Sequence, residues 1–580
     1  MFSPIGKAVR TKKWGHFRLS PYFTSPGNCL GISGRAVLHA YDASNLQNSL
    51  YTSMALGSVS FPTYFSTPMV FKGRVYMGTQ NKNGGPTEVD RLWALQRPVR
   101  RLHRLGGEKM RVSIRTLVVA GVICLFGGCA NGQMGQRSQA RLPFARNATG
   151  NFKSVICSPA PCVLPPTQVS DESNQVTDAP IAADPLNPKH LVVGSYDLNC
   201  MYAGFHSSLD GGLTWDLHCM PAINEPQGEY VPGGQPMVGY DSDGVAYIGD
   251  EYGVSEAGTG LVAIQKSSDG VSWSTPEIAL GPGNETEYFY ASLAVDANTE
   301  SPYANNLYVS AVALDEPYQD KNRVVVSHSS DGGMTWKAVA VAPVQIAPDI
   351  DNYTNMAISK DGTVYLTWMY CNSGFYFCED DFGYMVFSKS SDGGYTWSAP
   401  ALMTTVVLNH ESIPNTNTSA ENYPAIGVDN GDGPHSGNLY VVMYTWTGSY
   451  LRVQVIHSTD GGNTWSRPVP VAPDSDDHDQ FLPWISVSPA GLVGVSWLDR
   501  RNDPANIDYQ AFATISADGG LSFQPDVQLT AGFSNPNDND GSLGNYAGNA
   551  WDGPNYFVAA WMDNSNTEFL QDVVGGIRLK

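Results

Sequence analysis

The chain has 580 residues and a formal net charge of −21 at pH 7, and this charge is unevenly distributed. Residues 1–109 contain 15 Lys and Arg against 4 Asp and Glu, whereas residues 110–580 contain 19 against 51. So large an excess of carboxylates argues against nucleic acid as a partner, because phosphate contacts depend on Lys and Arg. Two stretches of opposite charge are also not expected to share one compact domain.

The stretch that begins at Met110 marks a boundary. Two basic residues, Arg111 and Arg115, are followed by an apolar run (117–126), small residues and Cys129. This order is typical of a secretory signal peptide, and the run is shorter than the roughly 20 residues of a membrane-spanning helix. The sequence LFGGC resembles a bacterial lipoprotein signal, in which Cys129 is lipidated and becomes the mature N-terminus. Plain secretion and a buried apolar segment are the alternatives.

The chain is therefore divided into an extension (1–109), a signal segment (110–130), a linker (131–166) and one large domain (167–580). The extension shows no sustained helical or strand period. We expect it to be disordered or poorly packed, or to lie upstream of a misassigned start. We expect the large domain to act outside the cytoplasm, either secreted or lipid-anchored to a bacterial cell envelope.

Six of the nine cysteines fall into local pairs, which is typical of disulfides in an oxidising compartment. A metal site is the rival interpretation, but no His stands at ligand spacing beside these cysteines. The expected pairs are Cys157 with Cys162, Cys200 with Cys219, and Cys371 with Cys378.

A turn motif recurs along the large domain. Five segments follow the pattern S-x-D-x-G-x-[TS]-[WF], and a sixth, SSDGVSW, is one residue shorter. The Asp side chain can accept backbone hydrogen bonds and Gly supplies a positive φ, so each copy predicts a tight turn between two strands. The repeated aspartates stand about 60 residues apart at Asp210, Asp269, Asp331, Asp392, Asp460 and Asp518.

The segments around each turn predict four short strands per repeat, as in ASLAVD, NLYVSAVAL, RVVVSHS and TWKAVAVA. Four-stranded repeats rich in Val, Ile, Tyr and Trp indicate the blades of a β-propeller. Seven second-strand segments occur, which favours seven blades with six as the alternative. The last repeat lacks a fourth strand, and we expect residues 167–170 to supply it and close the ring.

These boxes resemble the Asp-box repeats of the sialidase superfamily over about 410 residues. That superfamily includes sialidases, other glycan-active propellers and non-catalytic propellers, so the resemblance implies a fold without fixing an activity. It places the boxes on one face and implies a ligand site on the opposite face, which we call the ligand face. Loops between second and third strands, and between blades, open there.

A sialidase needs three arginines that clamp the sugar carboxylate, a Tyr nucleophile with a Glu partner, and an Asp acid. The family's first arginine stands in a Phe-Arg-Ile-Pro motif, whereas the corresponding stretch here, TDAPIAADP, contains no arginine. The arginines expected on the ligand face are Arg323, Arg452, Arg500 and Arg501, and salt bridges to nearby carboxylates are their alternative role.

Tyrosines recur just before the first strands of several repeats, at Tyr290, Tyr353, Tyr423 and Tyr546. They are expected either to stack on sugars at the channel mouth or to wedge neighbouring blades together. If the protein is an enzyme, we expect Tyr546 as the nucleophile. Its partner is then Glu287 or Glu421, and Asp178 is the acid.

Two functions remain open. One is a glycoside hydrolase of sialidase-like type, and the other is a non-catalytic surface propeller that binds glycan or protein. We expect a monomer that meets a membrane only through a lipid anchor. No cofactor is expected, although the oxygen-rich stretch DSDDHDQ (474–480) and DNDG (538–541) leave calcium open.

Overall fold

The computed structural model describes residues 160–580 apart from 254–258, 283–285, 316–320, 373–377, 379, 410–412, 417, 473–476 and 539–542. Before residue 160 it describes only strands. The chain divides into two compact units, Met1–Arg137 and Ser138–Lys580. Cys129 and the signal segment lie outside the described residues, so the predictions about them stay predictions.

The N-terminal unit contains two antiparallel sheets, where the sequence pattern predicted no strands. Apolar residues stand at both odd and even positions of β2, for example Val37 and Leu38, and this hides the strand period. One sheet is β1 (Phe17–Tyr22), β2 (Ser33–Asp42), β3 (Asn45–Thr52) and β4 (Ser58–Ser60); the other is β5 (Met69–Phe71), β6 (Arg74–Met77) and β7 (Trp93–Ala94).

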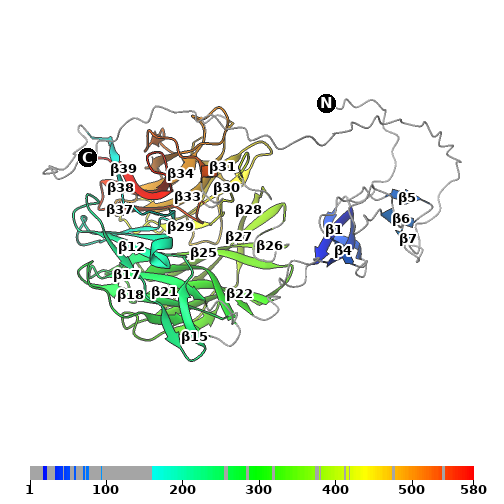
Figure 1. Cartoon of the computed structure of the whole chain (residues 1–580), viewed down its shortest axis with the longest axis horizontal. Coiled ribbons are helices and arrows are strands. Elements are labelled where there is room, and N and C mark those ends of the chain that lie inside the picture. The colour runs from blue at the N-terminus through cyan, green and yellow to red at the C-terminus, as the bar shows by residue number, and fades with distance from the viewer. Residues whose placement is uncertain are drawn as a thin grey trace, which may run out of the picture. The chain divides into compact units, whose positions relative to one another are not determined.

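Within residues 160–580, seven antiparallel sheets form the blades of an all-β propeller, as predicted (Figure 1). Blade 1 contains β10 (Ile181–Ala183), β11 (Leu191–Asp197), β12 (Tyr202–Ser208) and β13 (Asp216–Cys219). Blade 2 contains β16 (Met237–Tyr240), β17 (Ala246–Gly253), β18 (Gly260–Ser267) and β19 (Glu277–Leu280). Blade 3 contains β20 (Thr286–Val295), β21 (Leu307–Asp315), β22 (Lys321–Ser329) and β23 (Lys337–Ala340).

Blade 4 contains β25 (Ile350–Ile358), β26 (Val364–Cys371), β27 (Phe382–Ser390) and β28 (Ala401–Val407). Blade 5 contains β29 (Ala425–Val428), β30 (Leu439–Trp446), β31 (Leu451–Ser458) and β32 (Val469–Pro470). Blade 6 contains β33 (Gln480–Val487), β34 (Val493–Asp499), β35 (Gln510–Ser516) and β36 (Val527–Gln528). Blade 7 is β37 (Gly548–Asp552), β38 (Tyr556–Asp563), β39 (Gln571–Arg578) and β8 (Cys162–Gln168).

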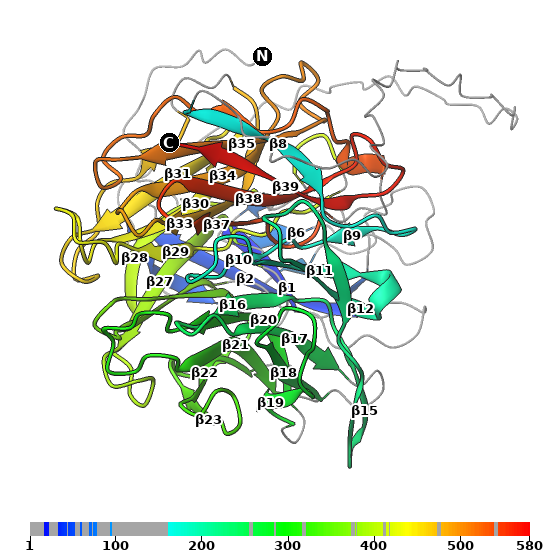
Figure 2. The same cartoon turned by 90° about the vertical axis from the view of Figure 1, so that its left-hand side faces the viewer.

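Two short strands and one hairpin pair with strands of the first three blades. The strand β9 (Val176–Thr177) pairs with β11, and β24 (Gln345–Ile346) pairs with β22. A hairpin of β14 (Ile223–Glu225) and β15 (Gly228–Pro232) extends blade 2 and projects from it (Figure 2).

The ring is closed by the N-terminal strand β8, which lies beside β39 (Figure 2). Thr167 pairs with Val574 and Cys162 with Arg578, so the two strands are antiparallel. The innermost strand of each blade contacts those of both neighbouring blades, and β10 contacts β37 across the closure. The predicted closure and the choice of seven blades over six are therefore confirmed, with the closing strand beginning five residues earlier than expected.

The middle strands of the blades are buried on both faces because each blade packs between two others. Every residue of β34 and β35 is buried. This explains why the second strands appear in the sequence as nearly continuous apolar runs rather than alternating ones. Among the fully buried side chains, Trp368, Trp497 and Trp561 each lie on the second strand of a blade.

The six repeated aspartates lie in the turns between third and fourth strands. In the turn of blade 4, the Asp392 carboxylate accepts hydrogen bonds from the Thr396 amide (2.9 Å), the Thr396 hydroxyl (2.6 Å) and the Ser390 hydroxyl (2.8 Å). Gly394 stands in this turn at φ 89°. These bonds hold the pKa of Asp392 below its usual value although partial burial opposes them.

Two of the three predicted disulfides are present, Cys200–Cys219 and Cys371–Cys378. Cys157 lies outside the described residues, so its predicted bond to Cys162 stays a prediction. No helix in the described part of the chain is long and apolar enough to span a membrane.

Candidate functional site

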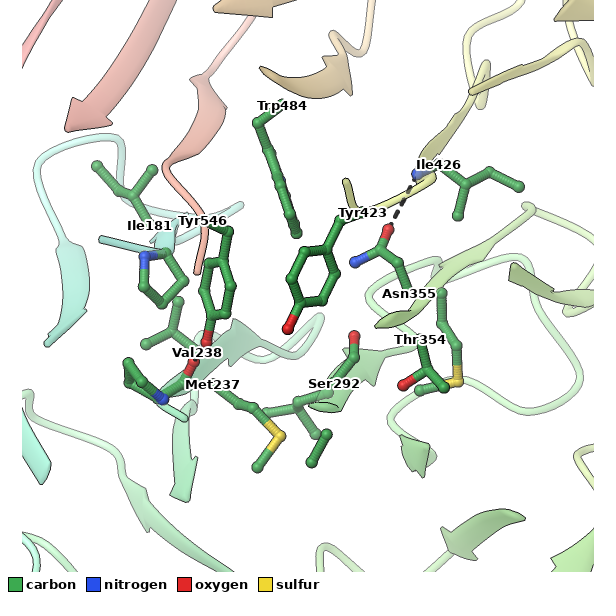
Figure 3. Close-up of a pocket in the computed structure, with 15 residues that line it drawn as sticks. Ile181, Met237, Val238, Ser292, Thr354, Asn355, Tyr423, Ile426, Trp484 and Tyr546 are labelled. Atoms are coloured by element: carbon green, nitrogen blue, oxygen red, sulfur yellow. Dashed lines mark hydrogen bonds between the residues drawn. The ribbon is translucent and has the colours of Figure 1, made fainter. Parts of the chain in front are cut away.

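A cavity of about 170 Å³ lies on the propeller axis, and residues on or beside the innermost strands of the blades line it (Figure 3). Its apolar lining includes Ile181, Met237, Val238 and Ile426. Its polar and aromatic lining includes Ser292, Thr354, Asn355, Tyr423, Trp484 and Tyr546. A cavity of roughly 150 Å³ accommodates one benzene ring, so this one matches a single small ring in size.

An aromatic layer adjoins this cavity, and two of its tyrosines, Tyr423 and Tyr546, line it. The ring centroids of Tyr290 and Tyr353 lie 4.6 Å apart, those of Tyr353 and Tyr423 5.0 Å, and those of Tyr423 and Tyr546 5.2 Å. Each tyrosine belongs to a different blade. Tyr353, Tyr423 and Tyr546 are only 3%, 4% and 5% exposed, so their rings chiefly wedge blades together. Tyr290 is half-buried.

Backbone geometry explains why these side chains converge. Tyr290 and Tyr353 stand at φ 56° and 59°, each in a β-bulge where the register with the second strand shifts. Asp178 (φ 61°) occupies the corresponding place in blade 1. A bulge residue in the left-handed region bends the strand and redirects its side chain, and non-Gly residues there often mark functional sites.

The layer contains a tyrosine–glutamate pair. The Tyr353 hydroxyl donates a hydrogen bond to the Glu421 carboxylate across the boundary of blades 4 and 5. Burial raises the pKa of Glu421, and burial together with the Glu421 charge raises the pKa of Tyr353 well above its usual value. A buried Tyr–carboxylate pair of this kind is a candidate for proton transfer.

Glu421 contacts Tyr353 and not Tyr546, the tyrosine for which the sequence offered Glu421 or Glu287 as partner. The Tyr546 hydroxyl donates to the carbonyl oxygen of Pro236 at 2.5 Å, so it points toward blade 2 rather than toward Glu421. Glu287, the other expected partner, is half-buried on β20 opposite Leu314. The direction of the Tyr546 side chain depends on packing between distant blades, which the sequence pattern does not contain.

Asp178 lies in the same region and joins blades 1 and 7. Its carboxylate accepts hydrogen bonds from the backbone amides of Asn545 and Tyr546 and from the Thr177 hydroxyl. Burial raises the pKa of Asp178 to about 7 against the opposing effect of these bonds, and the nearby Glu421 charge adds to the rise. Asp178 is thus a carboxyl group that can carry a proton near neutral pH.

Two further buried carboxyls, Asp250 and Glu251, belong to this region, although the sequence pattern did not single them out. Asp250 accepts hydrogen bonds from the amides of Gly234 and Gln235, both at 3.0 Å, and Glu251 accepts one from the Ala291 amide at 2.5 Å. Burial raises the pKa of Asp250 to about 8 and that of Glu251 well above its usual value. The available signal was a pair of adjacent acids inside the otherwise apolar second strand of blade 2.

We refer to Asp178, Asp250, Glu251, Glu421 and the four tyrosines as the tyrosine–carboxyl cluster. The Tyr423 hydroxyl is buried, points into the axial cavity (Figure 3) and has no hydrogen-bond partner among the described residues. A ligand hydroxyl or a water would satisfy it.

The arginines do not gather at this cluster. Arg500 is fully buried and pairs with Asp479 at 3.3 Å, while Arg501 pairs with Asp499 at 2.6 Å and with Asp526 at 2.5 Å.

The other two expected arginines do not line the axial cavity either. Arg452 donates to the Tyr450 hydroxyl and lies over its ring at 5.0 Å. Arg323 is half-buried on β22, opposite Ala313. None of the four is among the cavity-lining residues.

A metal site is not evident in the residues that the structure describes, where no group of three or more His, Cys, Asp or Glu is arranged to hold an ion. In the acidic stretch 474–480, positions 474–476 lie outside the described residues, and Asp479 is bound to Arg500. The calcium prediction therefore stays a prediction.

The sheet order defines this protein as a seven-bladed β-propeller. No protein-family model matches the chain, and the comparison with curated proteins found no match. Solved structures similar to it include the Hadza microbial sialidase Hz136 (13% identity, 65% of this chain and 73% of that one, TM-score 0.39). Another is the α-L-arabinofuranosidase Arb93A from Fusarium graminearum (14% identity, 59% of this chain and 92% of that one, TM-score 0.37). A third is the intramolecular trans-sialidase from Ruminococcus gnavus (14% identity, 58% of this chain and 94% of that one, TM-score 0.37). Likeness of this degree carries no argument about activity.

Proposed function

We propose that this protein is an exported propeller that binds glycans lacking a carboxylate, with the tyrosine–carboxyl cluster as the centre of its site. The observation that carries the proposal is the convergence of tyrosine rings and buried carboxyls from six blades around one axial cavity, which Tyr423 and Tyr546 line. Aromatic rings and hydrogen-bonding carboxyls suit sugar rings, which offer apolar faces and hydroxyl edges.

The ion pairs of the arginines argue against sialic acid as the ligand. A sugar carboxylate is held by guanidinium groups that are free to form bidentate bonds. Arg500 and Arg501 are already bound to Asp479, Asp499 and Asp526. A ligand carboxylate would have to displace these ion pairs and would also meet the acidic cluster, so an uncharged sugar or an amino sugar fits better.

Partly exposed aromatic side chains on the ligand face support a glycan as the ligand. Tyr370 and Tyr384 lie at the ligand-face ends of β26 and β27, with ring centroids 5.9 Å apart. Phe382 begins β27 and is exposed. Such rings offer flat surfaces on which sugar rings can stack.

The two disulfides support export, because such bonds persist in oxidising compartments. Secretion, lipid anchoring through Cys129 and a monomeric state remain parts of this proposal.

Glycoside hydrolysis is a second candidate, and the Tyr353–Glu421 hydrogen bond favours it. Hydrolysis of a glycosidic bond needs one group that donates a proton and a second that attacks or activates water. Asp178, with its pKa near 7, fits the acid role, and Tyr353 with Glu421 fits the nucleophilic role. This replaces Tyr546 as the nucleophile candidate.

Both candidates are tested by screening the full chain against an array of neutral, amino and sialylated glycans and by following product release with mass spectrometry. Binding of carboxylate-free glycans that is lost in Glu421→Gln and retained in Tyr395→Phe supports the proposal. Tyr395 is exposed on the box face and serves as the control. Release that disappears in Tyr353→Phe supports hydrolysis. Binding restricted to sialylated glycans, or absent altogether, would overturn the proposal.

A further inference from the structure

A second aromatic surface lies on blade 1, in the ligand-face loop between β11 and β12. The rings of Tyr196 and Tyr202 have centroids 5.4 Å apart, and Tyr202 is 39% exposed. Leu198 and Met201 in the same loop are 45% and 50% exposed. This loop therefore groups large side chains in solvent, and such grouping marks a binding surface more often than single exposed residues do.

The loop is built to hold this shape. Met201 and Tyr202 are consecutive non-Gly residues in the left-handed region, at φ 50° and 82°. Such backbone is strained in residues other than Gly and persists only when its surroundings fix it. The disulfide Cys200–Cys219 fixes it on one side, and Asp197 accepts a hydrogen bond from the Asn199 amide at 2.8 Å on the other.

The aromatic surface borders the tyrosine–carboxyl cluster. Tyr196 pairs in the sheet with Thr177, the residue that precedes Asp178. On its other side the Tyr196 ring packs so closely against Gly234 that a β-carbon there would lie 2.0 Å from the ring. The Gly234 amide in turn donates to Asp250. Tyr196 thus lies between two carboxyls of the cluster, and burial, the neighbouring Tyr202 and the Asp178 charge together raise its pKa.

Amide groups accompany the rings. Asn174 donates to the Asn199 side-chain oxygen at 2.7 Å, and both side chains are exposed. Flat aromatic faces beside neutral amide donors and acceptors match a sugar ring better than a purely apolar partner.

We propose that Tyr196 and Tyr202 form an aromatic subsite for a second sugar ring, so that the ligand is an extended neutral glycan whose terminal ring lies at the tyrosine–carboxyl cluster. The subsite deepens the proposed function and rests on it. Tyr202 supplies the exposed ring, Tyr196 orients that ring, and the strained loop keeps both in place before the ligand arrives.

The test is calorimetric titration of the full chain with glucose, galactose, arabinose and N-acetylglucosamine, each as monosaccharide and as linear tetrasaccharide. For the sugar that binds, we expect the tetrasaccharide to bind about 5–10-fold more tightly than the monosaccharide. Tyr202→Gly should remove this advantage, leave the monosaccharide unchanged and not lower Tm, because Gly adopts φ 82° without strain.

Met201→Gly is the matched control, since it also relieves a left-handed residue but removes no ring. It should leave binding of both ligands unchanged. Tetrasaccharide binding that is unaffected by Tyr202→Gly would overturn the subsite while leaving the proposed function standing, and this is the result expected if the loop serves a protein partner instead. Absence of binding by every sugar would overturn the proposed function and the subsite together.

Discussion

The Arg500 guanidinium and the Asp479 carboxylate lie 3.3 Å apart with both side chains fully buried. Arg500 also donates to the Pro414 carbonyl at 2.7 Å, and Asp479 accepts from the Leu451 amide at 2.8 Å, so the pair ties blade 6 to blade 5. Burial lowers the pKa of Arg500 to about 10, although Asp479 opposes this. The pair is therefore structural rather than a carboxylate clamp.

Breaking this pair should be strongly destabilising. We expect Arg500→Met to lower the free energy of unfolding by about 3–5 kcal/mol, because it leaves the Asp479 charge buried without its partner. Urea denaturation followed by tryptophan fluorescence measures the effect. The exposed Arg467 is the control, and Arg467→Ala should change stability by less than about 0.5 kcal/mol. Equal effects of the two substitutions would contradict the structural role of Arg500.

Stability should fall as pH rises from 5 to 8. The pKa of Asp178 is raised to about 7 and that of Asp250 to about 8, both by burial. Above the unfolded pKa near 4, the folded chain binds more protons than the unfolded chain, so unfolding becomes easier as pH rises toward the folded pKa values. Melting temperatures between pH 4.5 and 8.5 test this. Over this range we expect the free energy of unfolding to fall by an amount on the order of a few kcal/mol, and the melting temperature to fall with it.

One substitution isolates the Asp250 contribution to this profile. Asp250→Asn keeps an oxygen for the Gly234 and Gln235 amides but removes the titration. We expect it to flatten the profile and to exceed the wild type in stability at pH 8, whereas Asp216→Asn, at an exposed carboxyl, should leave the profile unchanged. A steeper profile in Asp250→Asn would refute this explanation.

The aspartate turns should matter more than ordinary surface charges. Asp392→Ala removes the hydrogen bonds to Thr396 and Ser390, and we expect it to cost about 1–2 kcal/mol of stability. The exposed ion pair of Lys360 and Asp432, at 3.1 Å, is the comparison, because such pairs contribute roughly 0–1 kcal/mol. Thermal unfolding of Asp392→Ala and Asp432→Ala distinguishes the two, and a larger loss in the second would argue against the turn as a stabilising unit.

The closing strand should be required for folding. A chain that begins at residue 160 keeps β8, whereas one that begins at residue 171 leaves the edge of β39 unpaired. We expect the first to elute as a folded species with a cooperative thermal transition and the second to aggregate. If the shorter chain unfolds at the same temperature as the longer one, β8 is not what holds the ring closed.

Much of the fold could be predicted because its signals are local. Each aspartate turn repeats a short hydrogen-bonding pattern, each second strand is a run of apolar residues buried on both sides, and the missing strand of the last repeat had a counterpart before the first. Paired cysteines close in sequence likewise indicated two of the disulfides that are present.

The candidate site could be predicted only in part. The recurrence of the four tyrosines at or near the first strands, with Asp178 and Glu421 close by, was visible in the sequence, but the partners of these side chains were not. Asp250 and Glu251 are recognisable in the sequence only as two adjacent acids in an apolar strand, which is a weak signal. The strained backbone at Met201 and Tyr202 leaves no signal in the sequence, because backbone strain has no sequence period.

By itself, the sequence determined the blade architecture and the closure of the ring, since both depend on patterns that recur from blade to blade. Only the tertiary structure decided that Glu421 meets Tyr353 rather than Tyr546, and that Arg500 meets Asp479 rather than a ligand. These choices depend on side chains from distant blades competing for the same buried hydrogen-bonding groups, and that competition exists only once the ring has closed.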